Sequence, residues 1–325
     1  MTERRIMFVF PGQGSQYRGM GSDLCQEFGI ARETYAEASE ALGCDMARLS
    51  FEDPAGEIGL TRNTQPALLT HEVACLRVFH ELAGRPVLPQ LAAGHSLGEY
   101  TALVAAGSLG LADGLRLVRR RGELMGEHGE GGMLALGLDA TAARAIADRH
   151  YCQVASINLP EQTVVGGREA DLEALAAEME RINPRKRAIR LATEGAFHTY
   201  LMVEAARRFR ETLDATPFAA PAVGVLSNYT AGLHDPEAGA IRTRLFFQLF
   251  NPVNWVGCLA SAMEQGITQM IEFGGGIGNG EGPADKRPNL ESIVRKTLKG
   301  ANYEAQYAAA INSATLRAAA EQFAG

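Results

Sequence analysis

The chain has 325 residues, 46% hydrophobic and 21% charged, which is typical of a globular protein with one large domain or two. Its net charge of −7 argues against a nucleic-acid partner, and no apolar run reaches the roughly 18 residues that a membrane span needs. The five cysteines form no C-x-x-C pair and the seven histidines form no ligand cluster. The sequence therefore predicts reduced thiols, no metal site and a cytoplasmic location.

The N-terminal part begins with a predicted strand, residues 5–10, which stops at a Gly-rich turn, residues 11–16 (PGQGSQ). The turn lacks the G-K-[ST] of a phosphate loop, so we expect an ordinary loop at the edge of a sheet. Two helices are predicted next, over 27–43 and 64–82, and Thr64 is the expected N-cap of the second.

Residues 94–98, Gly-His-Ser-Leu-Gly, carry a G-x-S-x-G pattern. The apolar run 87–93 before it predicts a strand, and residues 97–106 after it predict a helix. Strand, tight turn and helix are the context of a nucleophile elbow, in which Ser96 would be exposed to a cleft and the N–H of Leu97 would face an oxyanion. The alternative is an ordinary turn of small residues.

The second half of the chain predicts an inserted unit. After a helix over 113–127, the order is β-α-β-β-α-β, with strands at 133–138, 152–157, 163–165 and 187–191 and helices at 141–149 and 169–181. This order is typical of a ferredoxin-like unit. Further elements are a helix over 197–213, strands at 223–227 and 269–273, and a last helix over 307–323. We expect an α/β protein with a small subdomain, 131–197, inserted into a larger one, 1–130 and 198–325.

A serine nucleophile needs a base, and His198 is the best-placed histidine, between a strand end and a helix start. His95 adjoins Ser96, so its side chain must point elsewhere across the elbow and support the site. The other histidines are expected on the surface or on helix faces: His71, His80, His128, His150 and His234. No acid-bearing loop stands out between Ser96 and His198. A backbone carbonyl can also hold the imidazole tautomer, and the loop Asn251-Pro-Val is the candidate for it.

Two groups of basic residues have open interpretations. Arg121 ends the run 119–121 and offers a planar fork that matches a carboxylate, although three arginines on a helix also describe a solvated face. Arg185, Lys186, Arg187 and Arg190 form a second cluster. This cluster is either a docking patch for an acidic protein or a solvated strand edge.

Six motifs stand in one order along the chain: PGQGSQ, TQPAL, GHSLGEY, RRRGELM, GAFH and NPVNW. Together they resemble the malonyl-CoA:acyl carrier protein transacylases and the acyltransferase domains of polyketide synthases, over residues 8–280. The resemblance implies an α/β-hydrolase-like large subdomain with an inserted ferredoxin-like small subdomain. It implies Ser96 as acylated nucleophile and His198 as general base, an oxyanion hole from the N–H groups of Gln13 and Leu97, and the carbonyl of Asn251 orienting His198.

The same resemblance implies the substrate-binding residues Arg121, Phe197, Gln65, Met125 and His95, with Arg121 binding the free carboxylate of malonyl. The GAFH form is similar to polyketide acyltransferases that select malonyl, whereas methylmalonyl-selecting domains carry Tyr-Ala-Ser-His. One departure is the sequence Gly-Gly-Gly-Ile-Gly at 274–278, where the family has Gly-Pro-Gly. We expect it to loosen a loop near the cleft.

The implied reaction moves malonyl from malonyl-CoA to the phosphopantetheine thiol of an acyl carrier protein, through a malonyl-serine and without a cofactor. The chain looks most like a discrete, trans-acting polyketide acyltransferase, and a monomer is expected. Three alternatives remain: the malonyl transacylase of fatty-acid synthesis, a hydrolase that clears acyl carriers with water, and a docking protein without catalysis.

Overall fold

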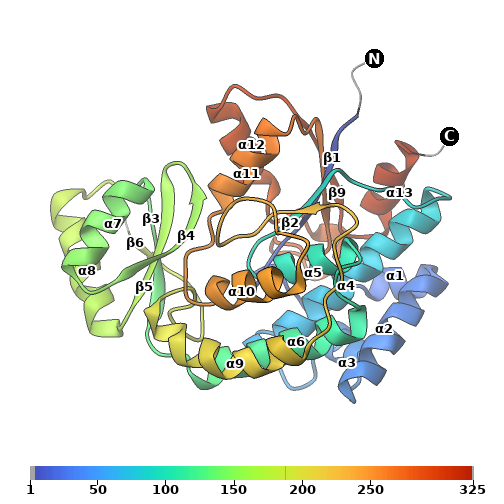
Figure 1. Ribbon diagram of the computed structural model, residues 1–325, viewed down its shortest axis with the longest axis horizontal. Helices are drawn as coiled ribbons and strands as arrows, with labels where there is room; N and C mark the ends of the chain where they lie inside the picture. Colours follow the sequence, from blue (N-terminus) through green and yellow to red (C-terminus); the bar gives the residue numbers. More distant parts are fainter. Residues whose placement is uncertain (1–3, 187, 324–325) are drawn as a thin grey trace.

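Two β-sheets organise the protein in the computed structural model, which describes residues 4–186 and 188–323. Figure 1 shows the smaller sheet with two helices at one end of the molecule, and the larger sheet with the other helices beside it. Within the described residues no helix is long and apolar enough to cross a bilayer. The five cysteines, all of them in the described part, are free thiols.

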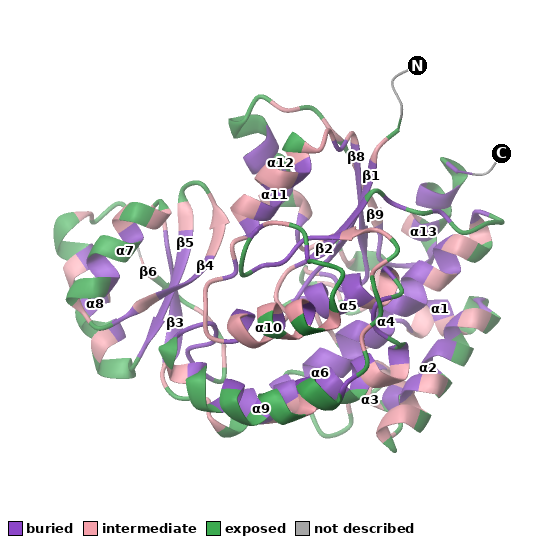
Figure 2. Cartoon of the chain, in the orientation of Figure 1, coloured by how far each residue is buried: buried purple, intermediate pink, exposed green. Residues whose placement is uncertain are grey.

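The larger sheet is wholly parallel, in the order β7-β2-β1-β8-β9. Its strands are β1 (Ile6–Phe10), β2 (Leu91–Gly94), β7 (Gly224–Val225), β8 (Gln269–Phe273) and β9 (Gln306–Ala310). Along β1, Phe8 and Phe10 enter one core cluster, and Met7 and Val9 enter another. Both faces of the sheet are therefore buried along its central strands, as parallel sheets require, and Figure 2 shows β1, β2 and β8 as buried. The edge strands β7 and β9 are partly exposed.

Helices cover the two faces of this sheet. The Met7 and Val9 face packs against α11 (Trp255–Glu264) and α12 (Glu291–Gly300). The long helix α4 (Thr61–Leu82) belongs to the core of the other face. The remaining helices of this part are α1 (Ser22–Glu27), α2 (Gly29–Leu42), α3 (Met46–Phe51), α5 (Gly98–Ala105), α6 (Leu111–Glu127), α9 (Val203–Ala215), α10 (Ala238–Gln248) and α13 (Ser313–Glu321). Two 3-10 turns, Tyr200–Met202 and Pro283–Asp285, complete the set.

The smaller sheet is antiparallel, in the order β4-β5-β3-β6. Its elements are β3 (Gly132–Leu136), α7 (Ala140–Arg149), β4 (Gln153–Leu159), β5 (Gln162–Gly167), α8 (Glu169–Ile182) and β6 (Ala188–Arg190). It has its own core, to which both helices contribute apolar side chains. The predicted β-α-β-β-α-β order is confirmed, whereas the exact limits of the two subdomains stay a prediction.

The chain enters and leaves the smaller sheet through two connections that lie side by side. The N–H of Ala196 donates to the carbonyl oxygen of Glu130 at 2.9 Å. A Cβ atom on Gly129 would lie 2.3 Å from the carbonyl oxygen of Glu194, and one on Gly195 would lie 2.7 Å from the Cα of Gly129. Only glycines permit this close approach of the two backbones.

The prediction of one last helix over 307–323 is wrong. Residues 306–310 form β9, which pairs in parallel with β8, and α13 follows after Asn312, whose side chain accepts from the N–H of Thr315. The alanines of this segment favour a helix locally, but the open edge of β8 offers a full set of backbone partners. Tertiary pairing therefore overrides local preference.

Three helix starts also differ from the predictions. Helix α4 begins at Thr61, and Thr64 lies inside it and donates to the carbonyl of Ile58 at 2.6 Å. The expected helix over 27–43 corresponds to α2, which begins two residues later, after an extended Phe28, and the short helix α1 before it was not predicted. The helix expected from 197 starts only at the turn from Tyr200, which leaves residues 195–199 free to shape the site.

Candidate active site

Ser96 lies on a tight turn between β2 and α5, in the left-handed backbone region with φ of 54°. The flanking glycines make the turn possible. A Cβ atom on Gly94 would lie 1.9 Å from the carbonyl carbon of Gly98, and one on Gly98 would lie 2.1 Å from the carbonyl oxygen of Phe10. A non-glycine residue with positive φ stores strain, which is typical of a functional turn. The elbow prediction is thus matched by the local geometry.

Ser96 and His198 face each other, with 2.7 Å between Ser96 Oγ and His198 Nε2. On the other side of the ring, Nδ1 donates to the backbone carbonyl oxygen of Gln248 at 2.8 Å. Because a carbonyl can only accept, the proton of the neutral ring is on Nδ1, and Nε2 accepts from the serine hydroxyl. This is the arrangement of a nucleophile, a base and a group that orients the base.

The residue expected to orient His198 was Asn251, and that prediction is wrong. Asn251 Nδ2 donates to the carbonyl of Phe247, and the carbonyl that reaches the imidazole is that of Gln248, three residues earlier. Gln248 is the last residue of α10, and the last carbonyls of a helix have no partner within it. No pattern in the sequence marks the end of α10, so the sequence alone favours the loop that follows it.

The imidazole of His198 is only 5% exposed, and it lies close to a guanidinium. Burial, and after it the positive charge of Arg121, lower the pKa of His198 to about 3, from 6.5 for an ordinary histidine. The unliganded protein therefore keeps His198 neutral, and able to accept a proton, throughout the physiological range of pH.

Because of this lowered pKa, we expect kcat/KM for Ser96 acylation to stay constant as the pH falls from 7 to about 5. A tenfold loss per pH unit below 6.5 would contradict it. The lowered pKa of His198 also affects the free energy of unfolding. A histidine with a raised pKa stabilises the folded protein at low pH, whereas His198 destabilises it there. The unfolded chain binds a proton at His198 below about pH 6.5 and the folded chain does not, so this group lowers stability as the pH falls. Urea unfolding of wild type and His198→Gln over pH 5–7.5 measures it.

Arg121 is 1% exposed and points at the serine from α6. Its Nη2 donates to Ser96 Oγ at 3.1 Å and to Gln248 Oε1 at 3.0 Å, and its Nη1 donates to Gln65 Oε1 at 2.9 Å. The guanidinium also lies 5.3 Å from the centre of the Tyr100 ring. All these partners are neutral.

No ion pair found in the described part of the chain includes Arg121, whereas its neighbours Arg119 and Arg120 both pair with Glu123. The solvated-face interpretation therefore fits those two residues and not Arg121. A buried cation without a carboxylate partner is costly unless an anion joins it, so the site is suited to an acidic group.

A cavity of about 390 Å³ opens in front of Ser96. All the residues predicted for the substrate line it: Arg121, Phe197, Gln65, Met125 and His95. Side chains from the smaller sheet and its return to α9 form the opposite wall, and sequence reasoning did not single them out: Met133, Ser156, Asn158, Val164 and Leu191. The cavity thus lies between the two sheets.

The backbone N–H groups around the serine have different uses. The N–H of Ser96 donates to Asn228 Oδ1 at 2.7 Å and is therefore occupied. The N–H groups of Gln13 and Leu97, both at the cavity wall, make no hydrogen bond within the described residues. Gln13 is held by its side chain, whose Nε2 donates to Thr61 Oγ1 at 3.1 Å. Two unoccupied donors beside a nucleophile are what an oxyanion hole requires.

His95 turns away from the serine, as its place on the elbow predicts. Its Nε2 lies 2.8 Å from Asn158 Oδ1 and 3.3 Å from Ser156 Oγ, both on β4. Burial lowers the pKa of His95, so its ring is neutral. The contact connects the elbow of the larger sheet to the smaller sheet.

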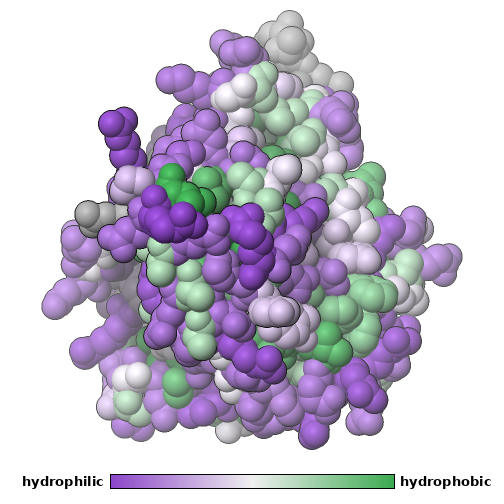
Figure 3. Space-filling model, turned by 90° about the vertical axis from the view of Figure 1, so that its left-hand side faces the viewer, coloured by the Kyte–Doolittle hydropathy of each residue, from purple (hydrophilic) through white to green (hydrophobic). Residues whose placement is uncertain are grey.

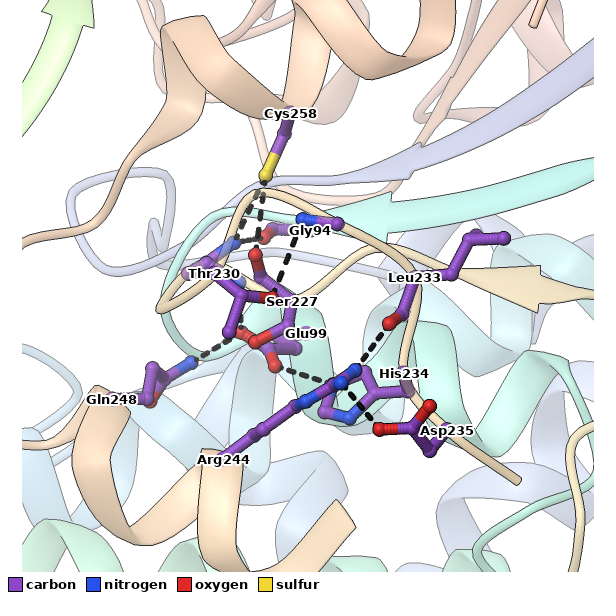
Figure 4. A network of polar contacts seen from close by, with 12 residues as sticks. Gly94, Glu99, Ser227, Thr230, Leu233, His234, Asp235, Arg244, Gln248 and Cys258 are labelled. Carbon is purple, nitrogen blue, oxygen red and sulfur yellow. Dashed lines mark hydrogen bonds and ion pairs between the residues drawn. The ribbon is translucent and has the colours of Figure 1, made fainter. Parts of the chain in front are cut away.

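Sequence reasoning missed a buried polar network beneath the elbow, shown in Figure 4. Glu99, Asn228, His234 and Gln248 are its main members, and all four are buried. His234 was expected on the surface, but its Nε2 lies 2.7 Å from Glu99 Oε1. Glu99, the glutamate of the GHSLGEY motif, could have indicated this network, since an acidic side chain beside a nucleophile elbow needs a hydrogen-bond donor.

The glycine loop at 274–278 is not loosened as expected. Gly274 and Gly275 have φ of 74° and 64°, and a Cβ atom on Gly275 would lie 2.6 Å from Ser15 Oγ. The N–H of Gly276 donates to the carbonyl of Ser15 at 2.8 Å. The glycines therefore permit close packing on the PGQGSQ turn.

A strained serine, a neutral histidine held by a carbonyl, and free N–H groups at the cavity wall define a serine acyl-transfer site on an α/β fold. Residues 7–272 match the acyl transferase domain family, and the chain belongs to that family. The predicted fold class and the predicted resemblance to the malonyl-CoA:acyl carrier protein transacylases are confirmed by the relatives below, and the chain is an enzyme of this kind.

Several relatives carry this activity in their names. The malonyl CoA-acyl carrier protein transacylase of Bacillus subtilis is 42% identical over 281 residues, 84% of this chain and 87% of the relative. The polyketide biosynthesis transacylase PksC of the same organism is 37% identical over 83% of this chain and 93% of its own. Among solved structures, FabD of Xanthomonas oryzae has a TM-score of 0.88, with 36% identity and 100% of both chains covered. A transacylase bound to a type II polyketide carrier, PlMCAT:AntF, has a TM-score of 0.87 at 33% identity, covering 98% and 99%.

Proposed function

We propose that the protein transfers a malonyl group from malonyl-CoA to the phosphopantetheine thiol of an acyl carrier protein. The observation that carries this proposal is Arg121, a buried cation without a carboxylate partner in the described residues, with its Nη2 3.1 Å from Ser96 Oγ. A malonyl thioester presents one free carboxylate close to its thioester carbonyl. The guanidinium would pair with that carboxylate while the carbonyl reaches the serine.

In the first half-reaction, Ser96 Oγ attacks the thioester carbonyl, and its proton passes to His198 Nε2. The oxyanion is stabilised by the N–H groups of Gln13 and Leu97. The intermediate collapses, the C–S bond breaks, and the leaving CoA sulfur takes the proton from His198. In the second half-reaction the carrier thiol gives its proton to His198 and attacks the malonyl-serine ester. The ester C–O bond then breaks, and Ser96 Oγ takes the proton back from His198. No cofactor takes part in either step.

Binding of malonyl would also raise the basicity of His198. The charge of Arg121 lowers the pKa of this histidine, and a carboxylate on Arg121 compensates that charge. The base would then be stronger in the complex than in the free enzyme. An acyl group without a carboxylate gives no such compensation, which adds to the preference for malonyl.

As a more specific role, we propose that the protein is a trans-acting acyltransferase that loads the carrier proteins of a polyketide synthase. The GAFH sequence that ends at His198 supports this role. Fatty-acid synthesis is the second candidate, and it is favoured by the 42% identical relative, whose name mentions no polyketide. A hydrolase is less compatible with Arg121, and a docking protein has no need of the Ser96–His198 pair. A monomeric state, a cytoplasmic location and the lack of a nucleic-acid partner stay predictions.

The test is transfer of labelled malonyl from malonyl-CoA to a panel of holo carrier proteins from both kinds of pathway. We expect a malonyl adduct on Ser96 by mass spectrometry, and label on the carrier thiol. Faster loading of polyketide carriers would support the trans-acting role, and equal or faster loading of a fatty-acid carrier would favour the second candidate. Release of free malonate in place of carrier loading would indicate a hydrolase.

Phe197 is expected to set the preference for malonyl over methylmalonyl. Its ring is 5% exposed and lines the cavity directly before His198, where an α-methyl group would need space. One methyl group discriminates by about 1–3 kcal/mol, so we expect a preference of roughly 10- to 200-fold. Phe197→Ser should narrow it, chiefly by raising the methylmalonyl rate. Competitive acylation by the two thioesters measures the ratio, and an unmoved ratio would make Phe197 ordinary core packing.

The second basic cluster is a candidate docking patch for an acidic carrier. Arg185 and Lys186 are exposed, Arg190 pairs with Glu169, and Arg187 lies outside the described residues. Figure 3 shows that this end of the molecule is mostly hydrophilic, with separate small apolar patches.

Reversal of both charges, in the double variant Arg185→Glu and Lys186→Glu, should slow transfer to the carrier and flatten its salt dependence. Acylation by malonyl-CoA should not change. Arg48→Glu, at an exposed position of α3, is the control. If the transfer rate and its salt dependence do not change, the cluster is ordinary solvated surface and does not bind the carrier.

A further inference from the structure

Glu99 is a buried carboxylate that the acyl-transfer chemistry above does not use. It lies in the first turn of α5, its exposure is 0%, and three N–H donors from separate segments reach it. His234 Nε2 lies 2.7 Å from Oε1, while the N–H of Asn228 and Gln248 Nε2 both donate to Oε2 at 2.9 Å. Figure 4 shows Gln248 and His234 converging on this side chain.

Gln248 is the member of this network that reaches the reacting groups. Its Nε2 donates to the carbonyl oxygen of Ser96 at 2.9 Å as well as to Glu99, and its Oε1 accepts from Arg121 Nη2 at 3.0 Å. An amide side chain has one end that donates and one that accepts. The neighbours decide which end points where, because Glu99 and the Ser96 carbonyl accept and Arg121 only donates.

We propose that Glu99 is a positioning residue that determines selectivity for a carboxylated acyl group. By accepting from Nε2, Glu99 fixes the Gln248 amide with its oxygen toward Arg121, and this oxygen holds the guanidinium at the angle that a malonyl carboxylate needs. The proposal rests on the proposed function, since it assigns the carboxylate to Arg121.

Loss of the acceptor at Glu99 has a specific consequence. One N–H of the Gln248 amide is then left in a buried space without a partner, and the amide is held only by the Ser96 carbonyl and by Arg121. An amide with this weaker hold can shift, and its oxygen then no longer fixes the angle of the guanidinium. A displacement of about 1 Å in a substrate-positioning group costs about 10²-fold in rate. Acetyl transfer does not use the guanidinium and loses less.

The first experiment compares Glu99→Met, Glu99→Gln and the control Glu72→Met, with kcat/KM for Ser96 acylation by malonyl-CoA and by acetyl-CoA as readout. Methionine keeps the length and replaces the two carboxylate oxygens with one weakly accepting sulfur, so we expect the malonyl-to-acetyl ratio to fall about 10- to 100-fold. Glutamine can keep one oxygen toward Gln248 and turn its NH₂ to His234, whose ring can change tautomer to accept. Glu99→Gln should therefore retain most of the ratio.

The control variant removes a second buried acidic side chain and leaves the Glu99–Gln248–Arg121 hydrogen bonds in place. Glu72 is also 0% exposed and accepts from Thr101 on the same helix α5, but no hydrogen bond joins it to Gln248 in the described part of the chain. Glu72→Met should lower the stability of the fold and leave the malonyl-to-acetyl ratio of kcat/KM unchanged. Equal losses for the two thioesters in Glu99→Met would overturn the proposal, since they would show that Glu99 only holds the fold.

A second variant keeps the test valid if Glu99→Met does not fold. Gln248→Met leaves Glu99 and the backbone carbonyl to His198 in place and removes only the amide. We expect the malonyl-to-acetyl ratio to fall as it does in Glu99→Met. In the double variant it should fall no further, because both changes remove the same Glu99–Gln248 hydrogen bond. An unchanged ratio in Gln248→Met, or additive losses in the double variant, would overturn it. Wild-type protein that forms no malonyl-Ser96 would refute the proposed function itself, and this proposal with it.

Discussion

Ser96→Ala should abolish the malonyl-enzyme adduct, because no other hydroxyl takes the place of Ser96 Oγ at the strained elbow. His198→Ala should slow acylation by about 10²-fold or more, the scale of a lost general base. Mass spectrometry of the intact protein after mixing with malonyl-CoA measures the adduct, and stopped-flow release of CoA measures the rate.

Two controls separate chemistry from folding in that experiment. His150, whose Nε2 pairs with Glu178 on the smaller subdomain, can be replaced by alanine with no expected effect on acylation. Circular dichroism of Ser96→Ala should match wild type. A covalent malonyl adduct that still accumulates in Ser96→Ala would show that the nucleophile is another residue.

Arg121→Ala should reduce malonyl transfer steeply, while acetyl transfer falls less or rises. Truncation of one partner of a buried charged pair costs about 2–5 kcal/mol, and only malonyl supplies the other partner. The measurement is kcat/KM for Ser96 acylation by the two thioesters. The lost positive charge also raises the basicity of His198, which works in favour of acetyl.

The matched control for this prediction is Arg120→Ala, one residue earlier on α6. Arg120 pairs with Glu123 at the surface, so its removal should change neither thioester rate. Equal losses for malonyl-CoA and acetyl-CoA in Arg121→Ala would exclude Arg121 from carboxylate binding.

The parts of the site that could be predicted from sequence are those that local chemistry determines. Gly94 and Gly98 mark the elbow because the turn tolerates no Cβ atom, and Arg121 stands in a motif with a specific residue order. The β-α-β-β-α-β insertion was predictable because its periodic apolar pattern changes at Gly129–Gly132.

The parts that could not be predicted depend on contacts between distant segments. Gln248 orients His198 through a backbone carbonyl, which any residue could supply, so no side chain marks the position. Glu99 and His234 are 135 residues apart, and only the fold brings them together. Strand β9 depends in the same way on the edge of β8, because its alanines alone favour a helix.

The close approach of Glu130 and Ala196, here called the neck, has a consequence for how the acyl cavity of this protein can be changed. Ser96 precedes the insertion along the chain and His198 follows it. The two ends of the insertion are joined by the hydrogen bond from the Ala196 N–H to the Glu130 carbonyl and by the contact of Gly129 with Gly195. Strand β4 also contacts the larger subdomain at His95 and Val253, so an exchange beyond this neck must keep these contacts if the dyad is to stay in place. Under that condition one wall of the acyl cavity is modular, and a chimaera can acquire a new pocket lining while it keeps Ser96 and His198.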